Sequence, residues 1–219
     1  MRRSAGTGRH LLVMAKAPVA GRVKTRLCPP LSASEAAGVA EAALAQTLEA
    51  VAASSADRKL LALSGQPGGW IPPGFTVFAQ RGGSFNERLA NAWFDAGGPG
   101  LQIGMDTPQV TAALLNDCLA EMDRPDHSAV LGPAEDGGWW ALGLNWGWEV
   151  DVFRGVAMST VTTGRDQRDR LEAVGHRVAP LPTLRDVDTF DDAVAVAACC
   201  PGSRLDRVLT TMLSTMVRP

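Results

Sequence analysis

The sequence lacks the residue patterns that mark several common kinds of site. None of its four cysteines forms a C-x-x-C pair, and no histidine cluster accompanies them, so a zinc site of the usual spacing is excluded. Cys199 and Cys200 are adjacent in the chain and are poorly placed to bridge each other. We therefore expect buried or idle thiols in a reducing compartment.

The sequence also lacks a long hydrophobic run and a strong excess of either charge. The first ten residues are polar, and the apolar run that follows is too short for a signal peptide or a membrane span. With 21 Lys and Arg against 23 Asp and Glu, the formal net charge is -2, whereas general nucleic-acid binders carry a broad basic field. We expect a cytoplasmic protein that binds no nucleic acid.

The length and composition fit one globular domain over residues 1–219, in which residues 1–9 form a flexible arm. Short apolar segments that resemble strands alternate with amphipathic helices, two of which begin with capping-box patterns at Ser32 and Ser84. This alternation predicts an α/β fold, a three-layer α/β/α sandwich with a mostly parallel sheet. The expected strands are 11–15, 58–63, 75–79, 101–105, 129–131, 139–144 and 177–181; the expected helices begin near residues 33, 85, 110, 190 and 204.

Ligands of such sheets collect beyond the carboxyl ends of the strands. The stretch "AKAPVAGRVKTRL", residues 15–27, follows the first expected strand and holds four cations but no acid. In an extended segment, alternating cations would point the same way, and with free backbone N–H groups they would form a polyphosphate cradle. The spacing is not that of a Walker A loop, and a solvated basic loop is an equal alternative. The candidate phosphate-binding residues are Lys16, Arg22, Lys24, Thr25 and Arg26.

Two acidic segments also follow expected strands. Asp106, in "GMDTP", would lie at the rim of the ligand crevice, where a carboxylate suits Mg²⁺ or Mn²⁺ bound to phosphate oxygens. Asp186 and Asp188, in "RDVDT", share one face of an extended segment, and Asp188 could complete a metal site with Asp106. The alternative for both segments is helix capping, with Thr107 and Thr189 as competing caps.

The segment "GPAEDGGWW" combines two acids, two glycines and two tryptophans. Glu135 or Asp136 could bind a sugar hydroxyl or act as a base, and Gly137 and Gly138 permit a close approach of the backbone. Trp139 or its neighbour could stack on a sugar or base ring. The alternative is a turn into a strand that points one tryptophan into the core, and we favour that for one of the two.

Taken together, "AKAPVAGRVKTRL", "NERL", "GMDTP", "GPAEDGGWW" and "DVDTFDD" resemble, in that order, the motifs of a bacterial glycosyltransferase-like family with the GT-A, or nucleotide-diphospho-sugar transferase, fold. Some of its members are described as arsenosugar-biosynthesis glycosyltransferases or radical-SAM/selenodomain-associated transferases. The resemblance implies a nucleotide over the first loop and a divalent metal near Asp106, with Asp188 as the second ligand. It also implies that Asp136, Gly137 and Gly138 border the sugar or acceptor pocket.

This sequence departs from the family pattern at several positions. Met105 replaces a small hydroxyl residue, Gln109 stands where an acid is common, and Phe190 stands where proline is usual. The family's usual continuation is also lost over residues 161–170, which bears on acceptor recognition. The phosphate and metal positions are the least affected.

Three hypotheses about function follow. The first is a metal-dependent transferase, foremost a glycosyltransferase that passes a sugar from a nucleotide sugar to a small-molecule acceptor, with Asp106 and Asp136 as catalytic residues. The second is a nucleotidyltransferase in which an acceptor attacks the α-phosphate of a nucleoside triphosphate and pyrophosphate leaves. The third is a nucleotide-binding protein without catalysis, which the altered segment 161–170 leaves open. The sequence does not identify the nucleotide base, the sugar, the acceptor or the oligomeric state.

Overall fold

The computed structural model describes residues 8–146 and 151–216 of the chain. Most of the expected N-terminal arm, residues 1–7, lies outside these ranges. Arg9 does not belong to a free arm, because its backbone N–H donates to Asp57 Oδ2 (2.8 Å) and its guanidinium donates to the Leu119 carbonyl. Among the described helices, none is both long and apolar enough to cross a membrane.

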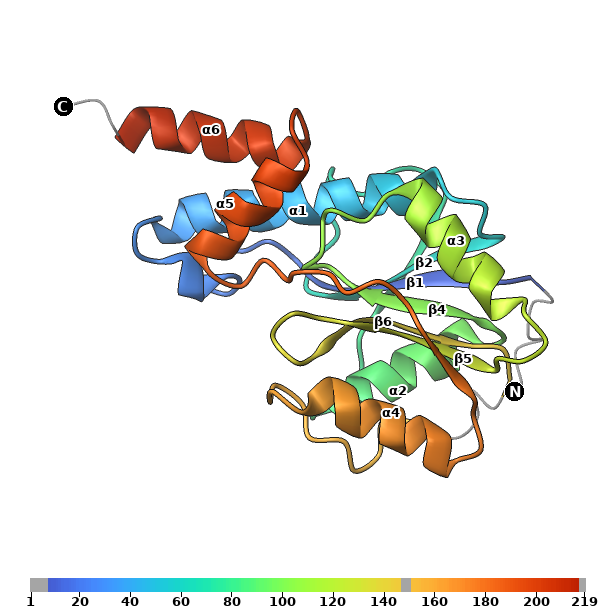
Figure 1. Cartoon of the computed structure of the whole chain (residues 1–219). Helices are drawn as coiled ribbons and strands as arrows, with labels where there is room; N and C mark the ends of the chain where they lie inside the picture. The colour runs from blue at the N-terminus through green and yellow to red at the C-terminus, as the bar shows by residue number, and fades with distance from the viewer. Residues whose placement is uncertain (1–7, 147–150, 217–219) are drawn as a thin grey trace.

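A twisted seven-stranded sheet forms the middle layer of the described molecule (Figure 1). The strand order is β3-β2-β1-β4-β6-β5-β7, and only β6 runs antiparallel to its neighbours, so the predicted mostly parallel sheet is confirmed. The strands are β1 (His10–Lys16), β2 (Arg58–Ser64), β3 (Phe75–Ala79), β4 (Gly100–Gly104), β5 (Ala129–Pro133), β6 (Trp139–Leu144) and β7 (Val178–Pro180).

Helices cover both faces of this sheet, as the α/β/α prediction requires (Figure 1). Helices α1 and α3 contribute to the core cluster on one face, and α2 and α4 to the cluster on the other. Helices α5 and α6 pack on the outer side of α1. The helices are α1 (Ala33–Ala52), α2 (Phe85–Ala96), α3 (Ala112–Met122), α4 (Thr163–Ala173), α5 (Phe190–Cys199) and α6 (Arg204–Met216), with a short 3-10 turn, η1 (Thr25–Leu27).

Local sequence explains where the helices begin. The predicted capping boxes are present at Ser32 and Ser84, where each hydroxyl accepts the N–H of a glutamate three residues on. Helix α3 begins two residues later than predicted, because Thr111 rather than an earlier residue caps it. Neither Asp106 nor Thr107 therefore serves as its cap.

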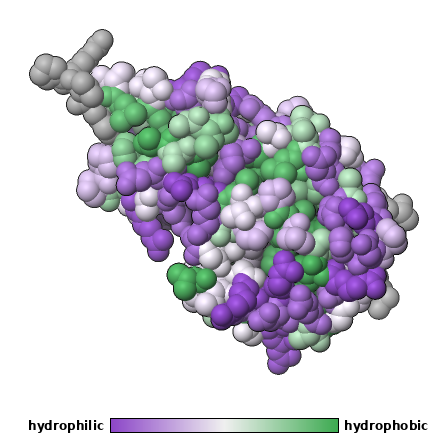
Figure 2. Space-filling model, viewed as in Figure 1, coloured by the Kyte–Doolittle hydropathy of each residue, from purple (hydrophilic) through white to green (hydrophobic). Residues whose placement is uncertain are grey.

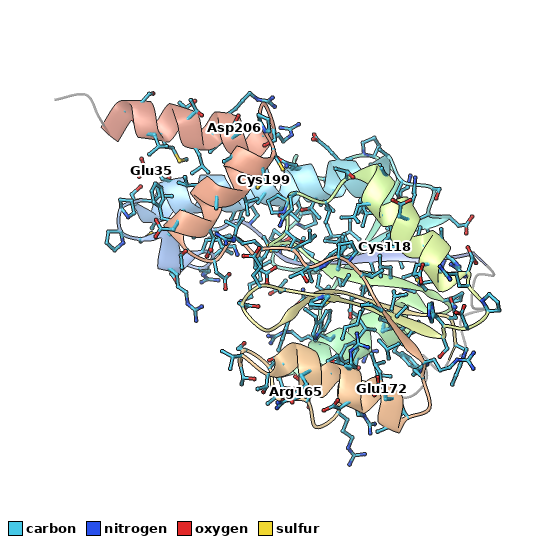
Figure 3. All side chains as sticks on the ribbon, in the orientation of Figure 1. Glu35, Cys118, Arg165, Glu172, Cys199 and Asp206 are labelled. Atoms are coloured by element: carbon cyan, nitrogen blue, oxygen red, sulfur yellow. The ribbon has the colours of Figure 1, made fainter. Side chains whose placement is uncertain are left out.

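All four cysteines are free, but only Cys118 is buried as expected; Cys199 is exposed, and the other two are half-buried. Cys118 of α3 and Cys199 of α5 come from different helices and lie well apart (Figure 3). Burial is the main cause that raises the pKa of the Cys118 thiol to about 12, so this cysteine behaves as a small core residue.

The topology places a switch point between β1 and β4. The chain leaves β1 through α1 toward β2 on one side, and it returns through α2 to β4 on the other side of β1. The connections after these two strands therefore diverge, which opens a crevice beyond their carboxyl ends. The basic loop follows β1 and Asp106 follows β4, so both belong to that crevice.

Candidate active site

A cavity of about 570 Å³ lies beyond the carboxyl ends of β1 and β4. In Figure 2 the surface is hollowed on the left, between the lobe that carries η1 and α5 and the part that carries the start of α4. Of the twelve residues that sequence analysis selected for the site, ten line this cavity and Glu135 and Gly137 do not. The ten are Lys16, Arg22, Lys24, Thr25, Arg26, Asp106, Asp136, Gly138, Trp139 and Asp188.

The basic loop is turned rather than extended as expected, yet all three of its alternating cations line the cavity. Lys24 adopts a left-handed backbone conformation (φ 48°, ψ 37°) and caps the turn η1. Buried Val23 and Leu27 anchor the loop, while Arg22 and Arg26 remain exposed. The three cations therefore differ in burial: Lys24 is shielded from water, whereas Arg22 and Arg26 are exposed at the cavity.

Lys24 is the shielded cation, and two carboxylates hold its ammonium group. Nζ lies 2.6 Å from Asp106 Oδ1 and 3.1 Å from Asp188 Oδ1. Its side chain is 8% exposed, whereas those of Asp106 and Asp188 are 39% and 41% exposed. Burial alone would lower the pKa of Lys24, but the two carboxylates outweigh it and raise the pKa above the usual value.

Backbone bonds bring the second acidic segment beside the first. The Val187 N–H donates to the Asp106 carbonyl (2.8 Å), and the Gln109 side chain donates to the Arg185 carbonyl (2.7 Å). Gln109, one of the departures from the family pattern, thus ties the two segments together. Thr189 caps α5 in a capping box, so the carboxylate of Asp188 is left to face the cavity.

Met105, a second departure, has a clear structural role. Its side chain is buried, and its sulfur accepts the backbone N–H of Lys16 at 3.2 Å. This bond joins the start of the basic loop to the end of β4. Met105 therefore helps to hold the rim of the cavity together beside Asp106.

Asp186 was noted in the sequence but was not selected for the site. It lines the cavity, and burial, followed by the nearby charges of Asp106, Asp136 and Asp188, raises its pKa to about 7. The alternating acids of "RDVDT" were the signal that could have selected it. This part of the cavity gathers four carboxyl groups against one buried lysine.

The glycine-rich turn between β5 and β6 packs mainly against its own chain. The Gly138 N–H donates to Asp136 Oδ1 (2.8 Å), which orients that carboxylate at the cavity. Gly137 has φ +90°, and a Cβ there would lie 2.2 Å from the carbonyl oxygen of Val161. The close approach predicted for Gly137 is thus to the segment before α4. Glu135 pairs instead with Arg185, at 2.7 Å between Oε2 and Nε.

The two tryptophans divide as the alternation predicts. Trp140 is buried in the core, where its Nε1 donates to the Pro182 carbonyl (2.8 Å). Trp139 is half-buried, lines the cavity and stacks on Phe153, with ring centroids 6.1 Å apart. One tryptophan therefore lies in the core, and the other lines the cavity, where a role in ligand binding stays a prediction.

Sequence reasoning missed the wall of the cavity opposite the basic loop. Arg88, quoted only within "NERL", lines the cavity from the first turn of α2, and its guanidinium lies 5.6 Å from the ring centroid of Phe85. Residues 158–161 and Thr163 form another part of this wall, where Ser159 has a positive φ of 61°. The altered segment thus begins at the cavity, and its bearing on acceptor recognition stays a prediction.

The acidic residues fit a divalent metal that would arrive with other ligands. Asp106 and Asp188 already converge on one cation, the ammonium of Lys24, and their hard oxygens are the donors that Mg²⁺ and Mn²⁺ prefer. Across residues 8–146 and 151–216, no three His, Cys, Asp or Glu side chains form a cluster that could hold a metal alone. Such a metal would complete its coordination with phosphate oxygens and water, as Mg²⁺ commonly does.

The fold and the position of the cavity define a class, the α/β proteins that resemble nucleotide-diphospho-sugar transferases. Within that class, the chain belongs to the family described as "Uncharacterized protein conserved in bacteria (DUF2064)", whose model matches residues 36–160, more than half of the chain. A search of curated proteins finds no match to this sequence.

Solved structures share this fold at low sequence identity. A protein from Desulfovibrio desulfuricans described as a "putative nucleotide-diphospho-sugar transferase" is 22% identical, with a TM-score of 0.81 over 93% of this chain and 94% of that one. The 2-C-methyl-D-erythritol 4-phosphate cytidylyltransferase of Thermus thermophilus is 18% identical, with a TM-score of 0.53 over 89% and 98%. The 4-diphosphocytidyl-2C-methyl-D-erythritol synthase of Anaerococcus prevotii is 10% identical, with a TM-score of 0.55 over 89% and 99%.

Proposed function

We propose that this protein is a metal-dependent transferase that uses a nucleotide-activated donor, foremost a nucleotide sugar. The observation that carries the proposal is the contact between the two segments that follow β1 and β4. Lys24 Nζ of the basic loop lies 2.6 Å from Asp106 Oδ1, and both residues line one cavity. Cations and a carboxylate that meet at a switch point are the parts needed to hold a metal-bound diphosphate.

The side chains divide into two functional groups. Exposed Arg22 and Arg26, with Lys16, would bind the phosphates of the donor and stabilise the charge of the leaving nucleotide. Asp106 and Asp188 would hold Mg²⁺ or Mn²⁺, which when bound supplies further neutralisation of that charge. The cations and carboxylates thus act mainly by positioning and electrostatic stabilisation.

The acceptor side of the proposal rests on Asp136 and the aromatic wall. The carboxylate of Asp136 is exposed at the cavity and oriented by the Gly138 N–H, so it can accept a proton from an acceptor hydroxyl. Glu135, the other candidate base, is engaged by Arg185 and does not line the cavity, so we assign the role to Asp136. Trp139 would stack on the sugar or the acceptor.

A nucleotidyltransferase is the second candidate. The four cations of the basic loop suit a triphosphate as well as a diphosphate, and two of the structural relatives bear cytidylyltransferase or diphosphocytidyl synthase names. The resemblance to arsenosugar-biosynthesis or radical-SAM/selenodomain-associated transferases would place the acceptor among specialised small molecules, and it forms part of the same proposal. Binding without catalysis is the third candidate.

Product analysis separates these candidates. Purified protein with Mg²⁺ or Mn²⁺ is incubated with a panel of nucleotide sugars, and separately with the four nucleoside triphosphates plus sugar phosphates and alcohols. Release of a nucleoside diphosphate from a nucleotide sugar supports glycosyl transfer, whereas release of pyrophosphate from a triphosphate supports nucleotidyl transfer. Metal-dependent thermal stabilisation by nucleotides without either product would support binding alone and contradict our proposal.

A further inference from the structure

Lys24 differs from the other cations of the basic loop in where its charge lies. Its side chain is 8% exposed, and Nζ contacts both Asp106 Oδ1 and Asp188 Oδ1, at 2.6 and 3.1 Å. Arg26 has a side chain that is 77% exposed, and it reaches Asp188 only at 3.6 Å. The ammonium of Lys24 therefore occupies the space between the two carboxylates that would bind the metal.

The backbone holds Lys24 in this position against its own preference. The left-handed conformation at φ 48° is unfavourable for a residue other than glycine, and such conformations persist only where the surroundings enforce them. Here the Leu27 N–H donates to the Lys24 carbonyl (3.0 Å), and buried Val23 and Leu27 fix the chain on both sides. The shielded position is thus built into the loop.

The charges set a requirement for any divalent ion that enters. Lys24, Asp106 and Asp188 alone carry a single net negative charge, and the ammonium lies between the two carboxylates proposed to bind the ion. Asp136 and Asp186 nearby add acidic groups, and Arg26 reaches Asp188 from the exposed side. A hydrated metal ion that arrives alone must compete with a short ion pair whose lysine is shielded from water, and it deprives the ammonium of its closest anionic partners. A metal that arrives on a polyphosphate brings phosphate oxygens, which give Lys24 a new anionic partner at the same cavity.

We propose that Lys24 is an internal stand-in for the metal, and that Asp106 and Asp188 bind a divalent cation more tightly together with a polyphosphate, to which Lys24 transfers its contact. This inference rests on the proposed function and defines the form of its substrate, a metal–polyphosphate complex. Metal binding and phosphate binding are then positively coupled, and the coupling is reciprocal. Removal of the Lys24 charge uncouples them.

The inference is tested by titrating the purified full chain with Mn²⁺ alone. Binding is measured as the loss of the electron-paramagnetic-resonance signal of free Mn²⁺. We expect Lys24→Met to bind Mn²⁺ about tenfold tighter than the wild type, within the usual range of coupling between two ligands. Lys59→Met is the matched control, since it removes a lysine charge that lies on β2 outside the cavity, where Nζ donates to the Ala52 carbonyl. It should change the affinity by about twofold or less.

Thermal unfolding gives a second readout that does not depend on activity. Inorganic pyrophosphate serves as the polyphosphate probe. We expect Mn²⁺ and pyrophosphate together to raise the melting temperature of the wild type by more than the sum of their separate effects. In Lys24→Met, and in Lys24→Gln in case the first variant folds poorly, most of the stabilisation should appear with Mn²⁺ alone.

The outcomes separate this inference from the function on which it rests. If the wild type binds Mn²⁺ alone as tightly as both Lys24 variants, or more tightly, Lys24 is no competitor and the inference falls while the metal site stands. If neither the wild type nor any variant binds Mn²⁺, with or without pyrophosphate, the metal site fails and both proposals fall.

Discussion

Cations lie beside other polar groups at both ends of β1, but the two ends bind these cations with different kinds of partner. At the amino end, the Arg58 guanidinium donates to the Ala96 and Gly97 carbonyls, at 2.7 and 2.5 Å, where α2 ends. His10 beside it is fully buried, and burial, followed by the charge of Arg58, lowers the pKa of His10 to about 3. At the carboxyl end, Lys24 meets two carboxylates whose outer oxygens face a cavity.

The difference shows which kind of buried polar group indicates a ligand. The amino end binds its cation with carbonyls at the negative end of a helix, and the atoms left without a hydrogen-bond partner there, His10 Nε2 and Arg58 Nε, are buried rather than open to a cavity. The carboxyl end places acids and cations together and leaves part of their hydrogen-bonding capacity open to the cavity. A strongly shifted pKa occurs at both ends, so it is the partly exposed cluster of opposite charges that marks the candidate site.

The largest expected effect on activity comes from removing a carboxylate at the carboxyl end of β1. We expect Asp106→Asn, which keeps the shape of the side chain, to lower the transferase activity by about 10²–10³-fold, because one charged partner of the proposed metal-diphosphate is lost. Initial rates with the best substrate from the product analysis provide the measurement. The matched control is Asp95→Asn, which removes a carboxylate paired with Arg81 on the surface of α2 and should leave the rate unchanged. Equal rates for Asp106→Asn and the wild type would contradict the site assignment.

The structure around His10, at the amino end of β1, should lose stability in acid. The pKa of His10 is about 3 in the folded chain and 6.5 as its ordinary value, so between these values the unfolded chain binds the extra proton and stability falls as the pH falls. From pH 7 to pH 5 this group alone should cost about 2 kcal/mol of unfolding free energy. Denaturant titrations of the wild type and His10→Gln at both pH values measure it. The difference isolates His10, and equal slopes in the two proteins would show that the ring is not held neutral.

The fold could be predicted from short sequence patterns because helix caps and strands depend mainly on residues that are close together in the chain. The capping boxes at Ser32, Ser84 and Thr189 fix helix starts with two short-range bonds each, and all three are present. The apolar segments became strands within one or two residues of the predicted bounds. The grouping of the basic loop with Asp106 also followed, since neighbouring parallel strands end at one edge of the sheet.

The arrangement within the site could not be predicted, because it depends on contacts between distant segments. An alternating row of cations predicts similar surroundings for each, but the loop turns at Lys24, which is shielded between two carboxylates while Arg22 and Arg26 stay exposed at the cavity. Nothing near Glu135 in the sequence indicates that Arg185 would bind it. Likewise, the missing side chain of Gly137 makes room for the carbonyl of Val161 rather than for a ligand.

The smallest effect of the three concerns Asp186 and has the opposite pH dependence from that of His10. Its pKa is about 7 in the folded chain against an ordinary 3.8, so the unfolded chain loses this proton first and the group costs stability as the pH rises between these values. Asp186→Asn should therefore stabilise the metal-free protein at pH 7 by about 1–2 kcal/mol, a figure reduced because the half-buried side chain is partly screened by water. At pH 4 the gain should nearly vanish, because the wild-type carboxyl is then protonated in the folded chain as well. Thermal unfolding of both proteins at pH 4 and pH 7 measures the difference. A gain in stability of equal size at both pH values would mean that burial and the neighbouring carboxylates do not raise the pKa of Asp186.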